Sequence, residues 1–195
     1  MLGVFVIILL AYLLGSIPFG LVLTKICGLG DIRNIGSGNI GATNVLRTGK
    51  KGLAALTLLC DCGKGAVAVL LAEVISPGSG PLAGLAVFMG HLFPIWLKFK
   101  GGKGVATALG VMFALSWPVG VIAIACWLFM ALTFRYSSLS ALVAAGQAPV
   151  TAYLLGYYET LWLTIVIVIM IFIKHRANIQ RLLDGTETKI ELKKK

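Results

Sequence analysis

Long uncharged apolar segments, separated by short charged or glycine-rich connections, dominate this sequence. A helix needs about 20 apolar residues to cross the hydrocarbon core of a bilayer. Seven candidates can be delimited by charge, proline or glycine: 2–24, 53–75, 82–97, 105–117, 119–134, 139–155 and 161–173. With 58% hydrophobic and 12% charged residues, the chain is too apolar for a soluble domain. We predict an all-α membrane protein with seven transmembrane helices, folded as a single domain over residues 1–195.

The first apolar segment lacks the basic start and the cleavage site of a secretory signal peptide, and it is longer than the apolar part of one. We therefore expect it to be a retained helix. Seven crossings with the N-terminus outside place residues 25–52, 98–104, 135–138 and 174–195 in the cytoplasm. These segments contain every lysine and arginine except Lys64: Lys25, Arg33, Arg47, Lys50, Lys51, Lys98, Lys100, Lys103, Arg135, Lys174, Arg176, Arg181, Lys189 and Lys193 to Lys195.

The opposite connections, at 76–81, 117–118 and 156–160, contain no lysine or arginine. The positive-inside rule therefore favours an odd number of spans in an inner-membrane protein, with the C-terminus in the cytoplasm. This basic rim also accounts for the net charge of +10, so we expect membrane lipids and no nucleic acid as partners. The four cysteines have no ligand spacing, and we predict no metal site, disulfide or cofactor.

The connection at 31–47 is dense in glycine and in hydrogen-bond donors. Its Gly-x-Gly-x-x-Gly pattern resembles a dinucleotide fingerprint, but it follows a membrane segment rather than a strand, so that interpretation is rejected. Glycines let backbone amides approach an anion, and cations supply charge. The residues that we expect to surround a phosphate are Gly36, Ser37, Gly38, Asn39, Gly41, Thr43, Asn44 and Arg47, with Arg33 nearby. The alternative is a flexible turn with solvated arginines.

A second glycine-rich connection, Gly101-Gly102-Lys103-Gly104, directly precedes an apolar segment. The free amides at the start of that predicted helix, the lysine ammonium and the Thr107 hydroxyl could converge on one phosphate. This is not a nucleotide-binding Walker A loop, because Leu97 stands where its first glycine is required and Gly104 replaces the serine or threonine that binds magnesium.

The last apolar segment leads into a third polar region. If its helix continues into the cytoplasm, His175 and Asn178 share a face and can reach one pocket. Alternatively, Lys174 and Arg176 are ordinary basic residues at the end of a membrane helix, whose long side chains extend to the polar surface of the bilayer. Residues 185–195 are expected to be a flexible basic tail that binds the surface or aids solubility.

Ionisable residues within the apolar segments need partners or a function. Asp61 and Lys64 are three residues apart and are predicted to form an internal ion pair, for which we favour a structural over a functional role, with Gly63 and Gly65 allowing close helix packing. His91 fits a hydrogen-bonded packing role as well as a functional one.

Five motifs together resemble the bacterial acyl-phosphate-dependent glycerol-3-phosphate acyltransferase family. In chain order they are Gly-Ser-Ile-Pro-Phe-Gly at 15–20, the Asn-Ile-Gly-Ser-Gly-Asn-Ile-Gly-Ala-Thr-Asn run at 34–44, Asp-x-x-Lys-Gly at 61–65, Gly-His-x-x-Pro at 90–94 with Phe-Lys-Gly-Gly-Lys-Gly-Val-Ala-Thr at 99–107, and His-Arg-x-Asn at 175–178. The resemblance extends over almost the whole chain.

The resemblance implies an enzyme that transfers a fatty acyl group from acyl phosphate to glycerol 3-phosphate, giving lysophosphatidic acid and phosphate in the first committed step of bacterial phospholipid synthesis. It implies seven helices, an active site facing the cytoplasm and a possible partnership with the soluble enzyme that makes acyl phosphate. Matched by motif, the reaction residues are Ser37, Arg47, Lys103, His175 and Asn178, and the glycines hold phosphate. The family also places hydroxyls near the start of a later helix, where either Ser138 or Ser140 could face the site.

The mechanism implied by this resemblance is substrate-assisted. The His-x4-Asp base of other glycerolipid acyltransferases is absent, because Trp96 follows His91 by five positions and Gln180 follows His175. A phosphate oxygen would accept the hydroxyl proton, while Arg47, Lys103 and Asn178 hold geometry and charge. Two other classes of function fit the sequence less well. An anion transporter predicts an internal repeat, which the chain lacks, and a non-catalytic scaffold leaves the placement of glycine and asparagine unexplained.

Overall fold

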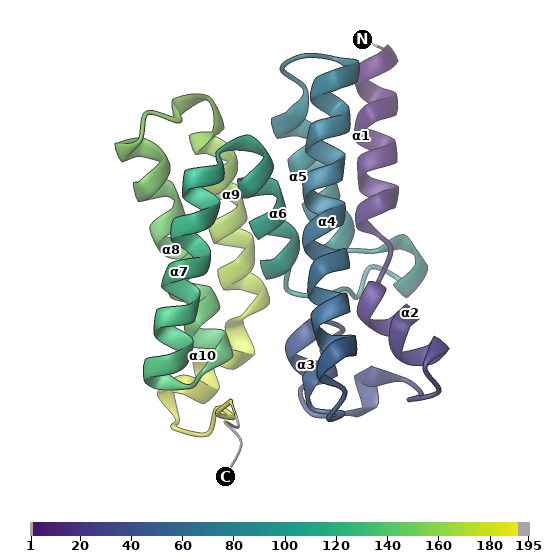
Figure 1. Ribbon diagram of the computed structural model, residues 1–195, viewed down its shortest axis with the longest axis vertical. Coiled ribbons are helices and arrows are strands. Elements are labelled where there is room, and N and C mark those ends of the chain that lie inside the picture. The colour runs from purple at the N-terminus through teal and green to yellow at the C-terminus, as the bar shows by residue number, and fades with distance from the viewer. Residues whose placement is uncertain (1, 191–195) are drawn as a thin grey trace. The chain divides into compact units, whose positions relative to one another are not determined.

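The computed structural model describes residues 2–190, and in this range the chain forms helices and turns without a strand. The α-helices are α1 (Leu2–Gly15), α2 (Phe19–Ile26), α3 (Ala42–Leu46), α4 (Lys51–Ile75), α5 (Gly80–Leu92), α6 (Val105–Leu115), α7 (Trp117–Phe134), α8 (Ser137–Leu154), α9 (Tyr158–Lys174) and α10 (Arg176–Leu183) (Figure 1). Two short 3-10 helices, η1 (Ile32–Asn34) and η2 (Ile95–Leu97), lie in the connections. The prediction of an all-α fold is confirmed.

The chain separates into two compact units, one up to Leu115 and one from Ser116 onward. In the first unit, α1, α4, α5 and α6 run in alternating directions, and α3 lies at the end of α4 from which that helix starts (Figure 1). In the second unit, α7, α8 and α9 alternate in the same way and α10 follows the end of α9 (Figure 1). The folding of residues 1–195 as a single domain stays a prediction.

Helices α4 and α6 pack with their backbones in close contact. A Cβ atom on Gly65 would collide with the carbonyl oxygen of Thr107, and one on Gly110 would collide with the carbonyl oxygen of Cys62. Glycine at both contacts therefore allows this approach. The prediction that Gly65 permits close packing is confirmed. For Gly63 it is wrong, because no atom lies within 4 Å of a Cβ placed there.

The first predicted helix is interrupted. α1 ends at Gly15, α2 begins at Phe19, and their axes differ by 43°. Pro18 lacks a backbone N–H and disfavours the helical conformation of the residue before it, which explains a break between residues 15 and 19. The expectation of one continuous helix over 2–24 is therefore wrong.

The third predicted helix also ends earlier than expected, at Leu92 instead of residue 97, because Pro94 follows. With 13 and 11 residues, α5 and α6 are about 20 and 17 Å long, shorter than the roughly 30 Å hydrocarbon core of a bilayer. The connection between them, residues 93–104, contains the second glycine-rich loop.

The seven predicted apolar segments all contain a helix, but their length and composition vary. The segments Gly80–Leu97 and Trp117–Phe134 are long and apolar enough to cross a membrane, and α1 with α2 and α9 with α10 pass the same test as bent pairs. Large apolar side chains such as Leu59, Leu70 and Phe129 are exposed, as a lipid-facing surface requires. The number of crossings and the side of each terminus stay predictions.

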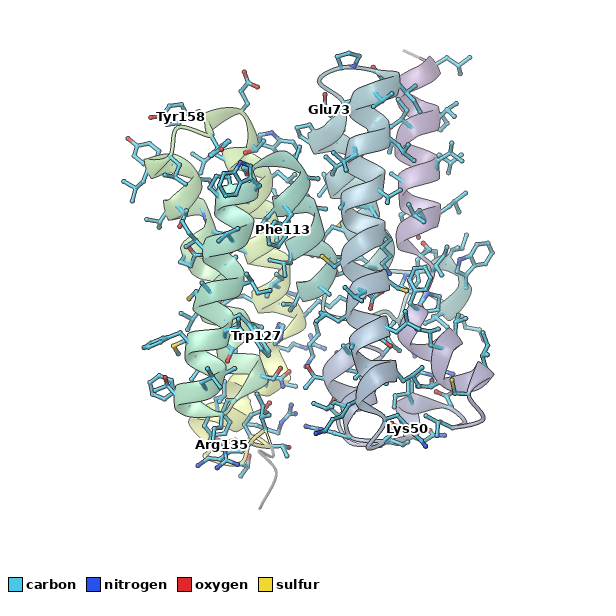
Figure 2. The ribbon with its side chains drawn as sticks, in the orientation of Figure 1. Lys50, Glu73, Phe113, Trp127, Arg135 and Tyr158 are labelled. Carbon is cyan, nitrogen blue, oxygen red and sulfur yellow. The ribbon has the colours of Figure 1, made fainter. Side chains whose placement is uncertain are left out.

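Within residues 2–190, each unit has one end with basic residues and an opposite end without them. Figure 2 shows Lys50 and Glu73 at opposite ends of α4 in the first unit, and Arg135 and Tyr158 at opposite ends of the second. Lys193 to Lys195, which were assigned to the cytoplasmic rim, lie outside the described residues.

Candidate active site

Asn44 organises the first glycine-rich loop from the inside. Its side chain is buried, and its amide nitrogen donates to the carbonyl oxygens of Ile32, Ile35 and Asn39 at 2.8–2.9 Å. Its amide oxygen accepts the backbone N–H of Ser37 at 3.1 Å and the hydroxyl of Ser37 at 3.4 Å. These bonds close the loop around one side chain, so Asn44 shapes the region in which a phosphate contact was predicted.

Gly36 leaves the space that the Arg47 side chain occupies. Its φ angle of 55° lies in the left-handed region, and a Cβ atom there would be 2.6 Å from Cδ and Nη1 of Arg47. The Arg47 guanidinium therefore lies directly over the backbone of Gly36, the residue that precedes Ser37. Arg47 and Ser37 are both exposed. The structure thus brings Ser37, Asn44 and Arg47 together, in an arrangement open to a ligand.

The remaining predicted residues of this loop form its frame. Gly38 has a φ angle of 69° and donates its N–H to the Ile35 carbonyl, Asn39 is half-buried, Gly41 precedes the first turn of α3, and Thr43 is exposed on that turn. Beneath the loop, Ile32, Ile40 and Val45 form a buried cluster with Leu21 and Ala54. Leu97, from the start of the second loop, packs against the same cluster.

Arg33 and Arg47 have different surroundings although they share a loop. The Arg33 guanidinium forms an ion pair with Asp31, with Nε at 2.9 Å from Oδ1 and Nη2 at 2.5 Å from Oδ2. Hydrogen bonds from the Arg33 side chain and backbone, together with its charge, lower the pKa of Asp31 to about 2. Arg33 is therefore committed to a carboxylate, and Arg47 is the better candidate for binding phosphate.

The second loop leads directly into α6, as predicted. The backbone N–H groups of Gly101 and Gly102 donate to the carbonyl oxygens of Leu92 and His91 at 3.2 and 3.1 Å, and Gly104 has a φ angle of 83°. α6 begins at Val105, where the first N–H groups of the helix have no intrahelical acceptor. Lys103 is half-buried beside them.

Thr107 lies in the first turn of α6 and is completely buried. Among residues 2–190, its hydroxyl finds no hydrogen-bond partner. Buried hydroxyls are usually bonded, so an unbonded one in this turn favours a site that a polar ligand completes. The helix start, Lys103 and Thr107 therefore form the second candidate anion site of the first unit.

In the second unit, the last helix does not continue straight through His175. α9 ends at Lys174, and α10 starts at Arg176 with a bend of 61°. Nδ1 of His175 lies 2.8 Å from the Ile171 carbonyl oxygen, and because a carbonyl can only accept, Nδ1 carries the proton. The bend leaves both His175 and Asn178 almost fully buried.

Glu187 was not among the predicted residues, but it joins two that were. Its Oε1 accepts from Nδ2 of Asn178 at 2.7 Å and from Oγ of Ser138 at 2.8 Å, and its Oε2 accepts from Nε of Arg181 at 2.7 Å. Burial alone would raise the pKa of this carboxyl, but these bonds and the charge of Arg181 outweigh it and lower the pKa. The sequence alone does not single it out, because Glu187 is one of two glutamates in residues 185–195.

The same contacts distinguish the two serines of α8. Ser138 shares Glu187 with Asn178, whereas the hydroxyl of Ser140 donates to the Tyr136 carbonyl of its own chain segment at 2.8 Å. The segment that carries Glu187 is held further by the Ile190 N–H, which donates to the Arg135 carbonyl at 2.6 Å. Hydrogen bonds that involve Glu187 and Ile190 therefore attach the start of this tail to the second unit.

No group of three or more histidine, cysteine, aspartate or glutamate side chains in the described part of the chain is arranged to hold a metal ion. The described donors are amides, hydroxyls and cations, which suit anionic ligands.

Comparison with known proteins extends over nearly the whole chain. The model of a family described as glycerol-3-phosphate acyltransferase matches residues 5–185. A glycerol-3-phosphate acyltransferase from Mesorhizobium japonicum is 59% identical over 191 residues, which cover 98% of each chain. One from Caulobacter vibrioides is 59% identical over 187 residues, covering 94% of this chain and 86% of the relative.

Two solved structures have the same fold. The crystal structure of PlsY, an integral membrane glycerol 3-phosphate acyltransferase, in its glycerol 3-phosphate form superposes with a TM-score of 0.92 at 42% identity and covers 96% of both chains. The lysophosphatidic acid form gives a TM-score of 0.89 at 40% identity, covering 96% of this chain and 95% of the other. From the family match and the full-length relatives, this chain belongs to the glycerol-3-phosphate acyltransferase family.

Proposed function

We propose that this protein is an integral membrane enzyme that transfers a fatty acyl group from acyl phosphate to glycerol 3-phosphate. The observation that carries the proposal is the pair of candidate anion sites in the first unit, one with Arg47 over Gly36 and one at the start of α6. Two sites suit two substrates that each carry a phosphate. The exposed apolar side chains of the helices suit a donor with a hydrocarbon tail.

The reaction forms one ester bond and breaks one anhydride bond. A glycerol hydroxyl oxygen attacks the acyl carbonyl carbon, and the bond from that carbon to the phosphate oxygen breaks. Inorganic phosphate leaves with the electron pair of that bond, and one of its oxygens takes the hydroxyl proton. The product is lysophosphatidic acid. Because phosphate is already a good leaving group, this transfer needs no strong protein base.

The side chains are proposed to position charge instead of forming a covalent intermediate. Arg47 and Lys103 neutralise phosphate oxygens, and Asn178 donates to the transferring group. Ser37 and His175 orient phosphate, His175 through the ring nitrogen that does not face Ile171. Gly36, Gly38, Gly41 and Gly101, Gly102, Gly104 allow the backbone to approach it. Asn39, Thr43, Thr107, Ser138 and Ser140 are proposed as further contacts, and Asn44 acts indirectly by holding the first loop in shape.

The site is proposed to face the cytoplasm from the inner membrane of a bacterial cell. All but one of the basic residues lie in the connections assigned to that side, and acyl phosphate would arrive there from the soluble enzyme that makes it. This would be the first committed step of phospholipid synthesis. The transporter and scaffold alternatives predict no chemical conversion of these substrates.

The decisive experiment supplies purified protein in detergent with palmitoyl phosphate and radiolabelled glycerol 3-phosphate. We expect lysophosphatidic acid and inorganic phosphate in equal amounts. Palmitoyl-coenzyme A tests the donor, and product formed at the same rate from it would contradict dependence on acyl phosphate. A stable acyl-Ser37 enzyme trapped during turnover would contradict direct transfer. Arg33→Ala serves as the matched control for Arg47→Ala, because both arginines belong to the same loop but only Arg47 lies over Gly36.

A further inference from the structure

Three ionisable side chains are buried together where α4 and α5 pack in the first unit. Asp61, Lys64 and His91 are 2%, 4% and 4% exposed. Nζ of Lys64 lies 2.8 Å from Oδ1 of Asp61, and Nδ1 of His91 lies 3.6 Å from the same oxygen. Burying charged groups is expensive, and a buried pair is often no more stabilising than apolar residues of the same size. Helix packing alone is therefore a weak reason for this cluster.

Lys64 ties the cluster to the break in the first helix. Its ammonium donates to the Ile17 carbonyl oxygen at 2.8 Å and lies 5.6 Å from the centre of the Phe19 ring. Both residues adjoin Pro18, between α1 and α2. Asp61 is thus held by a cation that is itself anchored at two points.

His91 ties the cluster to the second glycine-rich loop. Its carbonyl oxygen accepts the Gly102 N–H at 3.1 Å, and a Cβ atom on Gly102 would collide with Nε2 of its ring. One ring nitrogen therefore faces Asp61 and the other faces the backbone of Gly102. The imidazole is the link between a fixed carboxylate and the loop that precedes α6.

We propose that Asp61, Lys64 and His91 are positioning residues that fix the Gly101–Gly104 loop, and through it Lys103 and the start of α6, for phosphate binding. They act through the loop and do not touch the substrate. This inference rests on the proposed function and deepens it. It predicts that the cluster determines affinity for a phosphate-bearing substrate, an effect that a purely structural ion pair would not have.

The test is the double variant Asp61→Leu with Lys64→Met, which removes both charges while roughly keeping side-chain volume. Because replacement of a buried pair by apolar residues is often tolerated, we expect a folded, monodisperse protein with a melting temperature close to that of the wild type. We expect the KM for glycerol 3-phosphate or for palmitoyl phosphate to rise about tenfold or more, with a smaller change in kcat. Such a split is the mark of lost binding geometry.

The matched control is Glu73→Gln on the same helix. The Glu73 carboxylate accepts the N–H groups of Gly78 and Gly80 at 2.8 Å, at the end of α4 away from the glycine-rich loops (Figure 2). Both KM values should stay at the wild-type level. Unchanged KM values in Glu73→Gln would show that losing a carboxylate that holds a loop is not enough to weaken substrate binding, and that the effect is specific to Asp61.

A second variant, His91→Gln, tests the link directly. It removes the ring between Asp61 and Gly102 but keeps a polar amide, and we expect the same KM to rise as in the double variant. Combining it with Asp61→Asn should give less than the sum of the two effects, because the residues act in series. The proposal is overturned if the folded double variant or the folded His91→Gln variant has unchanged KM values. It is also overturned if neither variant folds, because a purely structural role would then explain why the three side chains are buried together. A wild-type protein without activity would instead contradict the proposed function.

Discussion

Asn44 and Arg47 are three residues apart in the first glycine-rich loop, but their side chains serve different purposes. Asn44 is buried and uses both ends of its amide to hold the loop, whereas the Arg47 guanidinium is exposed above Gly36. A phosphate ligand benefits from the planar fork of a guanidinium, which can donate two parallel hydrogen bonds. Lysine provides the charge without this geometry.

We therefore expect Arg47→Lys to lower kcat/KM by about tenfold to a hundredfold, corresponding to the roughly 1.5–3 kcal/mol of a hydrogen bond to a charged group. Steady-state kinetics with each substrate varied in turn will measure this. Arg33→Lys is the control, because Arg33 is paired with Asp31. Equal losses in both variants would contradict a specific role for Arg47, and no loss in either would show that positive charge alone suffices at this loop.

Glu187 links the tail to Asn178 and Ser138, and its effect should depend on pH. Its pKa is lowered in the folded protein, so its contribution to stability is complete above the ordinary glutamate range. That contribution is lost as the pH falls below about 4.5 and through the lowered folded-state pKa. Glu187→Gln keeps an acceptor for Asn178 but presents an amide to Arg181, so we expect a lower melting temperature at pH 7.

The measurement is thermal unfolding in detergent between pH 3.5 and 7. The difference between wild type and Glu187→Gln should be constant near neutrality and should shrink in acid. Glu159→Gln, at an exposed position in the first turn of α9, should match the wild type throughout. A difference for Glu187→Gln that persists unchanged at the lowest pH would indicate a steric effect of the amide.

At the scale of elements, the contact between α4 and α6 determines where the start of α6 lies. Gly65→Ala places a methyl group against the Thr107 carbonyl, and overpacking of this kind typically costs about 1–3 kcal/mol. We expect a lower melting temperature and, because Thr107 moves, reduced activity. Gly63→Ala should be neutral or slightly stabilising, since its Cβ meets nothing within 4 Å and alanine favours a helix by roughly 0.5–1 kcal/mol. Equal behaviour of both variants would contradict close packing at Gly65.

The helices and the ion pair were predictable because they depend on neighbours in sequence. Spacing alone predicts the Asp61–Lys64 pair, and both it and the helix start after Gly104 are confirmed. The ends of α1 and α5 were missed, because counting apolar residues ignores what Pro18 and Pro94 do to the backbone. In both cases apolarity continued while helical structure stopped.

Contacts between distant residues could not be predicted in this way. Ser138 and Glu187 are 49 positions apart, and His91 meets Asp61 from a different helix. Neither pair has a periodicity that would reveal it. The family resemblance identified Ser37, Arg47, Lys103, His175 and Asn178 as candidates, but the bonding partners that give each its environment became apparent only in the folded chain.

At the scale of the whole molecule, charge sidedness predicts how the chain lies in a membrane. In each unit one end is basic and the other lacks basic residues, as Lys50 and Glu73 illustrate for the first and Arg135 and Tyr158 for the second (Figure 2). A span with its basic end outside would oppose the positive-inside rule. Seven crossings satisfy the rule for every connection, with the N-terminus outside and the C-terminus in the cytoplasm.

Single cysteines in a background without Cys27, Cys60, Cys62 and Cys126 test this topology. A membrane-impermeant maleimide applied to intact spheroplasts should label Pro77→Cys and Glu159→Cys, which are exposed positions in two predicted outer connections. It should label Lys50→Cys and Thr188→Cys only in inverted vesicles, because these exposed positions belong to predicted cytoplasmic segments. Permeabilised membranes, in which all four must react, provide the control for accessibility. Labelling of positions 50 and 77 from the same side would remove α4 from the set of crossings, and the predicted odd number of spans would fail with it.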